Sequence, residues 1–439
     1  MKKFIQTIKN IYKIEELRKR IVYTFLLILV YRLGSFIVLP GIDPSVIAEF
    51  SASMSNRTDA LSLLNMFSGG AFGNVSIFAL GVMPYISASI VVQLLGVFVG
   101  KFRKMQAEES GRRKLNQITR LLTIVILCIQ GPAYISNIMH QYPNAFLVSS
   151  KLYILAATVI LLGGSMFVMW LGERITERGI GNGISLIIMI GIIARLPQAF
   201  MAEVLSKAGS TTGGILLLIV EFVILFFVFV AAIALVQAVR KVPVQYANRV
   251  IGNKQYGGVR QYIPLKVNAS GVMPIIFAQA IMLFPIIFSR FDATRGFAAA
   301  MSNYTGFWYN LVFGFLVIVF TYFYTAVTFQ PNMMAEDMKK NGGFIPGVKP
   351  GKKTMEYLDT IMTRIVLPGS IFLAIIAVLP AIATLCGVNN QFASFYGGTS
   401  LLILVGVVLD TLQQVESHLL MRHYDGLMKT GRLTGRSGM

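Results

Sequence analysis

Residues 213–239 read GGILLLIVEFVILFFVFVAAIALVQAV, and Glu221 is the only charged side chain among them. A helix of roughly 20 apolar residues crosses the roughly 30 Å hydrocarbon core of a bilayer, so this stretch predicts a transmembrane helix. Similar stretches recur along the whole chain. The predicted spans are residues 21–40, 75–99, 115–138, 151–171, 180–197, 213–239, 271–290, 308–330, 363–385 and 399–420. The sequence therefore predicts an all-α integral membrane protein with ten transmembrane helices.

The composition supports this class. Of the 439 residues, 55% are hydrophobic and 13% are charged, whereas soluble domains carry about twice that charged share. The first hydrophobic segment is long enough to span and follows a basic amphipathic leader, so we expect it to stay in the mature protein. Cys128 and Cys386 lie inside or at the end of predicted spans without the partners of a disulfide framework or a zinc site. We expect both to be packing residues.

The net charge of +20 follows a regular pattern along the chain. Such a charge suits a nucleic acid, an anionic lipid or an acidic partner. The loops between the basic segments hold few Lys or Arg residues. The basic segments are residues 1–20, 101–114, 240–266, 339–353 and 422–436. By the positive-inside rule they are cytoplasmic, which places the amphipathic N-terminal segment at 1–20 and a tail at 421–439 on the cytoplasmic side.

Two of the cytoplasmic loops are too long for simple connectors. In residues 240–270, segments rich in Val, Tyr and Ile flank Gly257 and Gly258, which predicts a β-hairpin. Residues 331–362 contain NGGFIPGVKPGKKT, whose Gly and Pro spacing predicts tight turns. Basic loops can serve topology alone, but the length and turn content of these two favour a surface that docks a partner.

The segment RTDALSLLNMFSGGAFGN at 57–74 is half apolar, too short to span, and falls on the outer side. Backbone at membrane depth is tolerated only where it is buried in protein or lines a watery cavity. Two interpretations stay open from these residues. The segment is either a small re-entrant helix that ends at Gly69 and Gly70, or an ordinary outer loop with an amphipathic turn.

The second and seventh spans contain Pro84 and Pro274, which predict kinks or loosened packing. Both spans also carry polar side chains, namely Ser87, Ser89 and Gln93 in one and Gln279 in the other. Polar contacts between membrane helices contribute only about 1 kcal/mol, so an interface of this kind could open reversibly. Static helix packing is the alternative.

The sequence offers little chemistry for catalysis or ion coupling. The charged residues within spans are Arg32, Glu221, Asp410 and Glu416, and they form no obvious set for an ion-coupled site. We expect them to be paired or to reach the interface. HExxH and GxSxG motifs are absent, the histidines are scattered, and GIGNGIS at 179–185 does not follow a strand. We therefore expect neither an enzyme, nor a cofactor, nor a metal site.

Several stretches together are similar to the SecY family, in order and over residues 15 to 429. They are FSGGAF at 67–72, IFALGVMPYISASIVVQLL at 77–95, ESGRRKLNQITR at 109–120, MWLGERITERGIGNGISLII at 169–188, VPVQYANR at 242–249, IPLKVNASGVMPIIFAQ at 263–279, FIPGVKPGKKT at 344–354 and GGTSLLILVGVVLD at 397–410. The resemblance implies a channel for unfolded polypeptides, built from two inverted five-helix halves at 21–197 and 213–420. Such a channel resides in the bacterial inner membrane.

The resemblance also implies roles for particular residues. A ring of bulky aliphatic side chains narrows the pore, and it falls on Val82, Ile86, Ile188, Ile192, Ile276, Ile403 and, less directly, Ile281. A plug at 60–73 seals the outer funnel and includes Leu61, Leu64, Phe67, Gly69 and Gly70. A lateral gate admits signal sequences and transmembrane segments, and its polar residues are Ser87, Gln93, Gln130 and Gln279.

The two cytoplasmic loops resemble docking sites for the ribosome, including its RNA, and for the SecA motor ATPase. Their contact residues are Arg249, Lys254, Arg260, Lys349, Lys352 and Lys353. The family typically has an arginine where this chain has Lys349, and an ammonium cannot reproduce a bidentate guanidinium fork. Further expected partners are SecE-type and SecG-type small membrane subunits and anionic lipids.

Two rival functions remain at this point. A secondary transporter of a small solute also has about ten spans and inverted repeats, and it would need essential carboxylates at a solute site. An accessory channel for glycosylated serine-rich substrates is the second alternative. The complete cytoplasmic loops favour the general channel.

Overall fold

The computed structural model describes residues 14–47, 65, 67–147, 151–208, 214–246, 249–251, 254–256, 260–282, 296, 301, 303 and 305–430. Each predicted span contains a helix. These helices are α2 (Glu15–Gly34), α5 (Met83–Phe98), α7 (Glu109–Gln141), α8 (Lys151–Arg178), α9 (Gly183–Ala208), α10 (Gly214–Gln237), α11 (Met273–Met282), α14 (Phe307–Thr328), α16 (Lys352–Leu385) and α18 (Gly398–Thr430). Within the described residues, seven helices are long and apolar enough to cross a membrane. The shorter α5 and α11 and the more charged α2 complete the set.

The second span starts later than the sequence predicts. The expected start is residue 75, but α5 begins at Met83, because residues 68–82 form successive turns in which Gly69, Gly70 and Gly81 have positive φ. Pro84 lies in the first turn of α5, where the N–H that proline lacks would have no helical partner. Pro84 thus starts the helix instead of kinking it.

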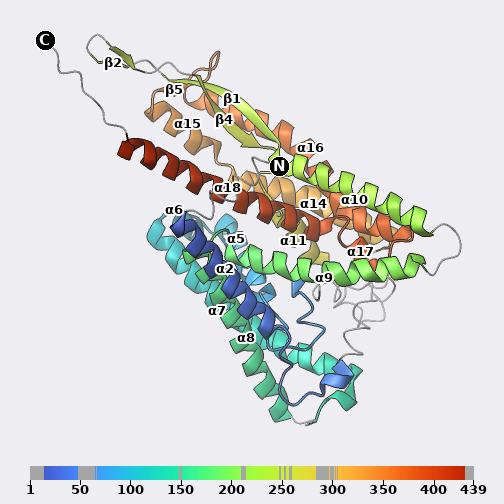
Figure 1. The fold of residues 1–439 in the computed structure, drawn as a ribbon. Coiled ribbons are helices and arrows are strands. Elements are labelled where there is room, and N and C mark those ends of the chain that lie inside the picture. Colours follow the sequence, from blue (N-terminus) through green and yellow to red (C-terminus); the bar gives the residue numbers. More distant parts are fainter. Residues whose placement is uncertain are drawn as a thin grey trace.

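The helices fall into two groups (Figure 1). In one group, α2, α5, α7 and α8 pack on one another, and in the other, α10, α11, α14, α16 and α18 do so. Helix α9 runs between the groups and packs against α8 on one side and against α10 and α18 on the other. The short helices α6 (Gly100–Ala107), α15 (Pro331–Lys340) and α17 (Asn390–Ala393) lie in connections.

The two long loops fold into one unit that projects beyond the helices (Figure 1). Strand β1 (Val239–Tyr246) pairs antiparallel with β4 (Arg260–Lys266) and with β5 (Gly343–Phe344), in the order β4-β1-β5. Strands β2 (Arg249–Ile251) and β3 (Lys254–Tyr256) extend the hairpin. This confirms the hairpin predicted for 240–270, although Gly257 and Gly258 lie outside the described residues. Side chains of both loops share an apolar core that includes Val244, Leu265 and Ile345.

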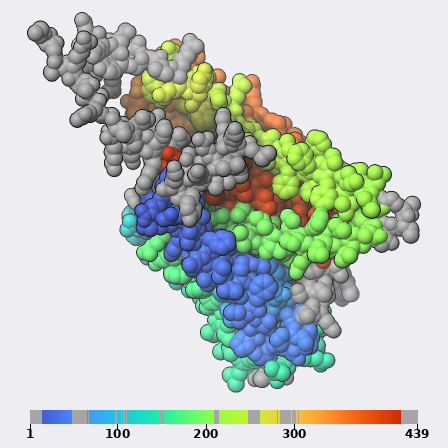
Figure 2. Space-filling model, viewed as in Figure 1, coloured from blue at the N-terminus to red at the C-terminus, as the bar shows by residue number. Residues whose placement is uncertain are grey.

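Apolar side chains cover much of the outer surface, as a membrane protein requires. On the face shown in Figure 2, α2, α9 and α10 form much of the surface. Helix α10 exposes Leu216, Phe226 and Phe227, and only 11% of its most apolar window is buried inside the protein. Glu221, the single charged residue of α10, is one of the few residues of this helix that are buried.

Candidate functional site: an apolar constriction and its covering turn

Five of the predicted ring residues belong to one apolar core, and we call Val82, Ile86, Ile188, Ile192 and Ile403 the central cluster. Val82 directly precedes α5 and Ile86 lies in its first turn, Ile188 and Ile192 come from successive turns of α9, and Ile403 comes from α18. All but the partly buried Ile86 are buried, with Ile192 fully so. Three helices that are distant in the sequence thus present aliphatic side chains to one place.

Helix α11 places its two predicted ring residues elsewhere. Ile281 is exposed and Ile276 is half-buried, and neither belongs to the apolar core around the central cluster. The buried face of α11 instead contains Ile275, Ala278 and Met282, which belong to the apolar core of the second group, where α11 packs against α14 and α18. The residue that brings this segment to the central cluster is Val272, just before the helix.

The turn at residues 67–76, which we call the covering turn, lies against the central cluster. Phe67 packs against the same apolar core. Two residues of α2 hold the turn: Tyr31 Oη donates to Ser68 O at 3.2 Å, and Arg32 Nη1 donates to Gly69 O at 3.2 Å. From α7, Tyr134 Oη donates to Phe72 O at 2.6 Å. The turn is therefore tied to two helices of the first group.

A close contact between glycines lets the covering turn reach α9. Gly69 has φ +65°, and a Cβ built on it would lie 2.7 Å from the Cα of Gly191. A Cβ on Gly191 would lie 3.0 Å from Phe67 O and 3.1 Å from Gly69 N. Gly191 directly precedes Ile192 of the central cluster. Of the predicted plug residues, Phe67 packs on the apolar core of the cluster and Gly69 lies against Gly191, whereas Leu61 and Leu64 lie outside the described residues. A Cβ on Gly70 would lie 3.9 Å from Arg195 Nε.

The predicted gate residues make hydrogen bonds that are either within one helix or long. Ser87 Oγ donates to Met83 O at 3.2 Å and Gln93 Nε2 donates to Ser89 Oγ at 3.3 Å, both within α5. Gln279 Nε2 of α11 donates to Thr399 Oγ1 of α18 at 3.4 Å. Gln130 lies on an exposed face of α7. The structure therefore does not join the four residues in one hydrogen-bonded set.

The predicted docking residues gather on the projecting unit. Arg249 pairs with Tyr256 across the β2–β3 hairpin, Lys254 pairs with Ile251, and Arg260 begins β4. In the second loop, Lys349, Lys352 and Lys353 are exposed near the start of α16. Lys353 Nζ lies 2.9 Å from Glu356 Oε2, and Thr354 Oγ1 donates to Lys349 O at 3.0 Å. In the described part of the chain, no His, Cys, Asp and Glu group has the arrangement of a metal site.

Comparison with known proteins decides the family. The model of the family described as SecY matches residues 76–412. The chain is 41% identical to protein translocase subunit SecY of Halalkalibacterium halodurans, over 97% of this chain and all of that one. It is 40% identical to the Thermotoga maritima subunit of the same name, over 98% and 99% of the two chains. The chain belongs to the SecY family.

Solved structures agree with this family. A structure described as that of a protein conducting channel matches with a TM-score of 0.59 at 17% identity, over 95% of each chain. Sec61 from a canine ribosome-channel complex matches with a TM-score of 0.56 at 16% identity, again over 95% of each. At these identities the likeness concerns the fold. This SecY-family chain is a multi-pass membrane protein whose relatives are protein translocase subunits, and it is not an enzyme.

No sequence pattern points to the residues that hold the covering turn. Tyr31 and Tyr134 read as ordinary span residues, and Arg32 was expected only to be paired or to reach the interface. Their partners are main-chain carbonyl groups 37 to 62 positions away. Gly191, inside an apolar stretch of a SecY-family span, is the one sequence feature that indicates the contact between the covering turn and α9, because a glycine in a helix often marks a close backbone approach.

Proposed function

We propose that this chain is the central channel subunit of a Sec translocon in the inner membrane of a bacterium. It passes unfolded secretory polypeptides across that membrane and releases transmembrane segments sideways into lipid. The observation that carries this proposal is the meeting of α5, α9 and α18 at the central cluster, beneath a separately held turn.

The central cluster is the pore constriction in this proposal. A narrow ring of aliphatic side chains expels water and so blocks ions, because ions do not enter an apolar constriction without their hydration. The same side chains offer no hydrogen bonds, so they bind no particular sequence as a polypeptide passes. Such a ring seals the membrane around substrates of any composition.

The covering turn acts as the plug. Three side-chain hydrogen bonds hold it, and each contributes about 0.5–1.5 kcal/mol net. These three bonds together contribute a few kcal/mol by that scale, which an entering polypeptide can offset with its own contacts. The far end of the turn is held more firmly, because Leu39 N donates to Val75 O at 3.0 Å and Val75 is buried. The plug can therefore leave the constriction and return.

The lateral gate lies between the halves at 21–197 and 213–420, along α5 and α11. Its residues are Ser87, Gln93, Gln130 and Gln279. The hydrogen bonds of Ser87 and Gln93 stay within α5 and that of Gln279 stays within the second half, so none of these bonds crosses the gate. Polar contacts between membrane helices are in any case worth only about 1 kcal/mol each. Parting the halves there costs little. A signal sequence or a new transmembrane helix then partitions through the opening according to its hydrophobicity.

The projecting unit is the docking platform for the SecA motor and for the ribosome with its RNA. Because β5 of the second loop joins the sheet of the first loop, basic residues from both loops belong to one folded unit. SecE-type and SecG-type subunits bind in the membrane, and anionic lipids neutralise the basic cytoplasmic face. The positive-inside charge pattern supports a cytoplasmic location for that face and for both termini.

Protease protection tests the proposed function. Membrane vesicles that contain this subunit, its small partner subunits and the SecA motor should shelter an added secretory precursor from external protease when ATP is present. Vesicles without the subunit should leave the precursor exposed. Stoichiometric uptake of a small solute, with no protected precursor under any condition, would instead favour a secondary transporter and refute the proposal.

A further inference from the structure

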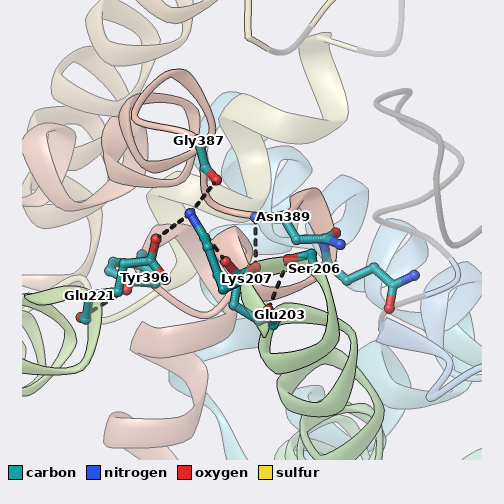
Figure 3. Close-up of polar contacts among 8 residues, drawn as sticks. Glu203, Ser206, Lys207, Glu221, Gly387, Asn389 and Tyr396 are labelled. Atoms are coloured by element: carbon teal, nitrogen blue, oxygen red, sulfur yellow. Dashed lines mark hydrogen bonds and ion pairs between the residues drawn. The ribbon is translucent and has the colours of Figure 1, made fainter. Parts of the chain in front are cut away.

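Two glutamate side chains and one lysine side chain meet near the end of α9, and Figure 3 shows them. Lys207 Nζ lies 2.9 Å from Glu221 Oε1 and 3.7 Å from Glu203 Oε1. We call Glu203 and Glu221 the carboxyl pair. Glu203 is 1% exposed and Glu221 is 8% exposed. Two carboxyl groups are therefore held out of water around one ammonium group.

Each member of the carboxyl pair has one oxygen with a close partner and one without a hydrogen-bond donor. Glu203 Oε2 accepts from the backbone N–H of Asn389 at 2.8 Å, and Glu221 Oε1 has the lysine ammonium. Glu203 Oε1 and Glu221 Oε2 are buried and have no hydrogen-bond partner in the part of the chain that the structure describes. A buried carboxylate oxygen without a donor is costly, so these two oxygens need an explanation.

The charges around the carboxyl pair do not balance if both groups are ionised. Lys207 supplies one positive charge against two negative charges, and it also donates to Gly387 O at 3.0 Å. Tyr396 adds no charge, because burial and then the Glu221 and Glu203 carboxylates raise its pKa. Its hydroxyl therefore stays protonated, and it donates to Glu221 O at 2.8 Å. One negative charge would remain uncompensated out of water, which is unfavourable.

The two carboxyl groups are close enough to share a proton. The Glu203 side chain is within hydrogen-bonding distance of the Glu221 side chain. Two ionised carboxylates repel each other at such a distance, whereas one proton between them replaces the repulsion by a hydrogen bond. The same proton supplies a missing donor and cancels the excess negative charge. A single proton thus accounts for the contact, the unpaired oxygens and the charge balance.

We propose that Glu203 and Glu221 together bind one proton, so that the carboxyl pair is a proton-binding site of the channel. The titration belongs to the pair and not to either residue alone. The site contacts Gly387 and Asn389 in the loop at 386–398, which the charge pattern predicts to be on the outer side. The proton therefore comes from the outer compartment, and this placement, unlike the binding itself, rests on the proposed function. By mass action, a more acidic outer compartment stabilises the intact site.

Infrared spectroscopy of the assembled complex in lipid tests the proton directly. The C=O stretch of a protonated carboxyl group lies at a higher frequency than the stretches of a carboxylate. Near neutral pH the parent should show such a band. Glu203→Gln and Glu221→Gln should each abolish it, because the one remaining carboxylate then balances the charge of Lys207. A band that persists in either assembled variant would overturn the shared proton.

A lysine variant and a surface variant check the charge balance. Lys207→Met removes the ammonium, so both carboxyl groups should be protonated and the band should grow about twofold, because an unpaired buried charge costs more than a protonated carboxyl. Glu15→Gln is the matched control, because Glu15 is 68% exposed and pairs with Lys19 at 2.9 Å on the surface. It should keep the band of the parent. An unchanged band in Lys207→Met would contradict the proposed charge balance.

Isotope labelling of the parent decides the question if the glutamine variants do not assemble. Glutamate labelled with ¹³C at the side-chain carboxyl group should shift the band to lower frequency, since the described glutamates that are buried are those of the carboxyl pair. A parent without the band, as expected if a sodium ion neutralised the pair, would overturn the proposal. A band that the label does not shift would overturn it as well. The protease test judges the proposed function separately, because the infrared band requires no transport.

Discussion

Vesicles that contain the Gly191→Val variant should leak ions at least about fivefold faster than vesicles with the parent. A free-energy change of about 1–3 kcal/mol shifts a conformational equilibrium about 5–150-fold, and fivefold is the lower end of that range. The covering turn leaves no space for a side chain at this position. A Cβ there would lie 3.0 Å from Phe67 O and 3.1 Å from Gly69 N. Overpacking of this kind costs about 1–3 kcal/mol, and the turn can relieve it by moving away from α9.

The measurement is ion flux from vesicles with equal amounts of assembled complex. Gly163→Val in α8 is the matched control, because a Cβ at Gly163 meets nothing within 4 Å. Gly191→Ala should fall between the parent and Gly191→Val. If Gly191→Val vesicles are as tight as those of Gly163→Val, the covering turn does not seal the channel by its contact with α9.

Ile192→Asn should let water enter the constriction. The ion leak should rise about tenfold above the parent for each 1.4 kcal/mol by which the substitution stabilises water there. Ile192 is fully buried in the central cluster. A buried amide without partners costs about 1–3 kcal/mol, and entering water relieves that cost. This relief favours the hydrated state that an aliphatic ring prevents.

Its neighbour supplies the control for that experiment. Ile193 is 38% exposed and points away from the central cluster. Ile193→Asn introduces the same amide on the same helix but should leave the leak at the parent level. Equal leaks from the two variants would show that the constriction does not depend on the buried face of α9.

The spans could be predicted from the sequence because the bilayer requires each of them to be an apolar helix long enough to cross it. Helix α10 illustrates this: its residues are apolar on all sides and most face outward. The start of α5 could not be predicted in the same way. Residues 75–82 are as apolar as the helix that follows, so hydropathy does not separate turns from helix there. The positive φ of Gly81 marks the difference.

The site was predictable only in part. Apolar periodicity does not tell which face of a span meets its neighbours, so the members of the central cluster came from the family resemblance. On α11 the buried face contains Ile275 and Ala278, whereas the resemblance placed the ring on Ile276 and Ile281. The hydrogen bonds from Arg32 and Tyr31 to the covering turn depend on the tertiary fold, and no local pattern announces them.

Glu221 shows what a lone charge in a span can and cannot reveal. The cost of an unpaired charge in hydrocarbon predicts that Glu221 has a partner. The partner is Lys207, on the preceding helix and beyond the predicted end of the fifth span. Lys207 also donates to Gly387 O, and Glu203 accepts from Asn389 N, both in the connection between α16 and α17, and these contacts follow only from the tertiary fold.

Crosslinking to an arrested substrate tests most directly whether the central cluster lines the path of the polypeptide. A secretory precursor stalled in the complex is challenged with single cysteines, in a Cys128→Ser and Cys386→Ser background, at Ile86, Ile403 and Val408. Ile403 is buried in the cluster, and Val408 lies on an exposed face of the same helix, α18. We predict crosslinks at Ile86 and Ile403 and none at Val408. Crosslinks at Val408 without any at Ile86 or Ile403 would contradict the account.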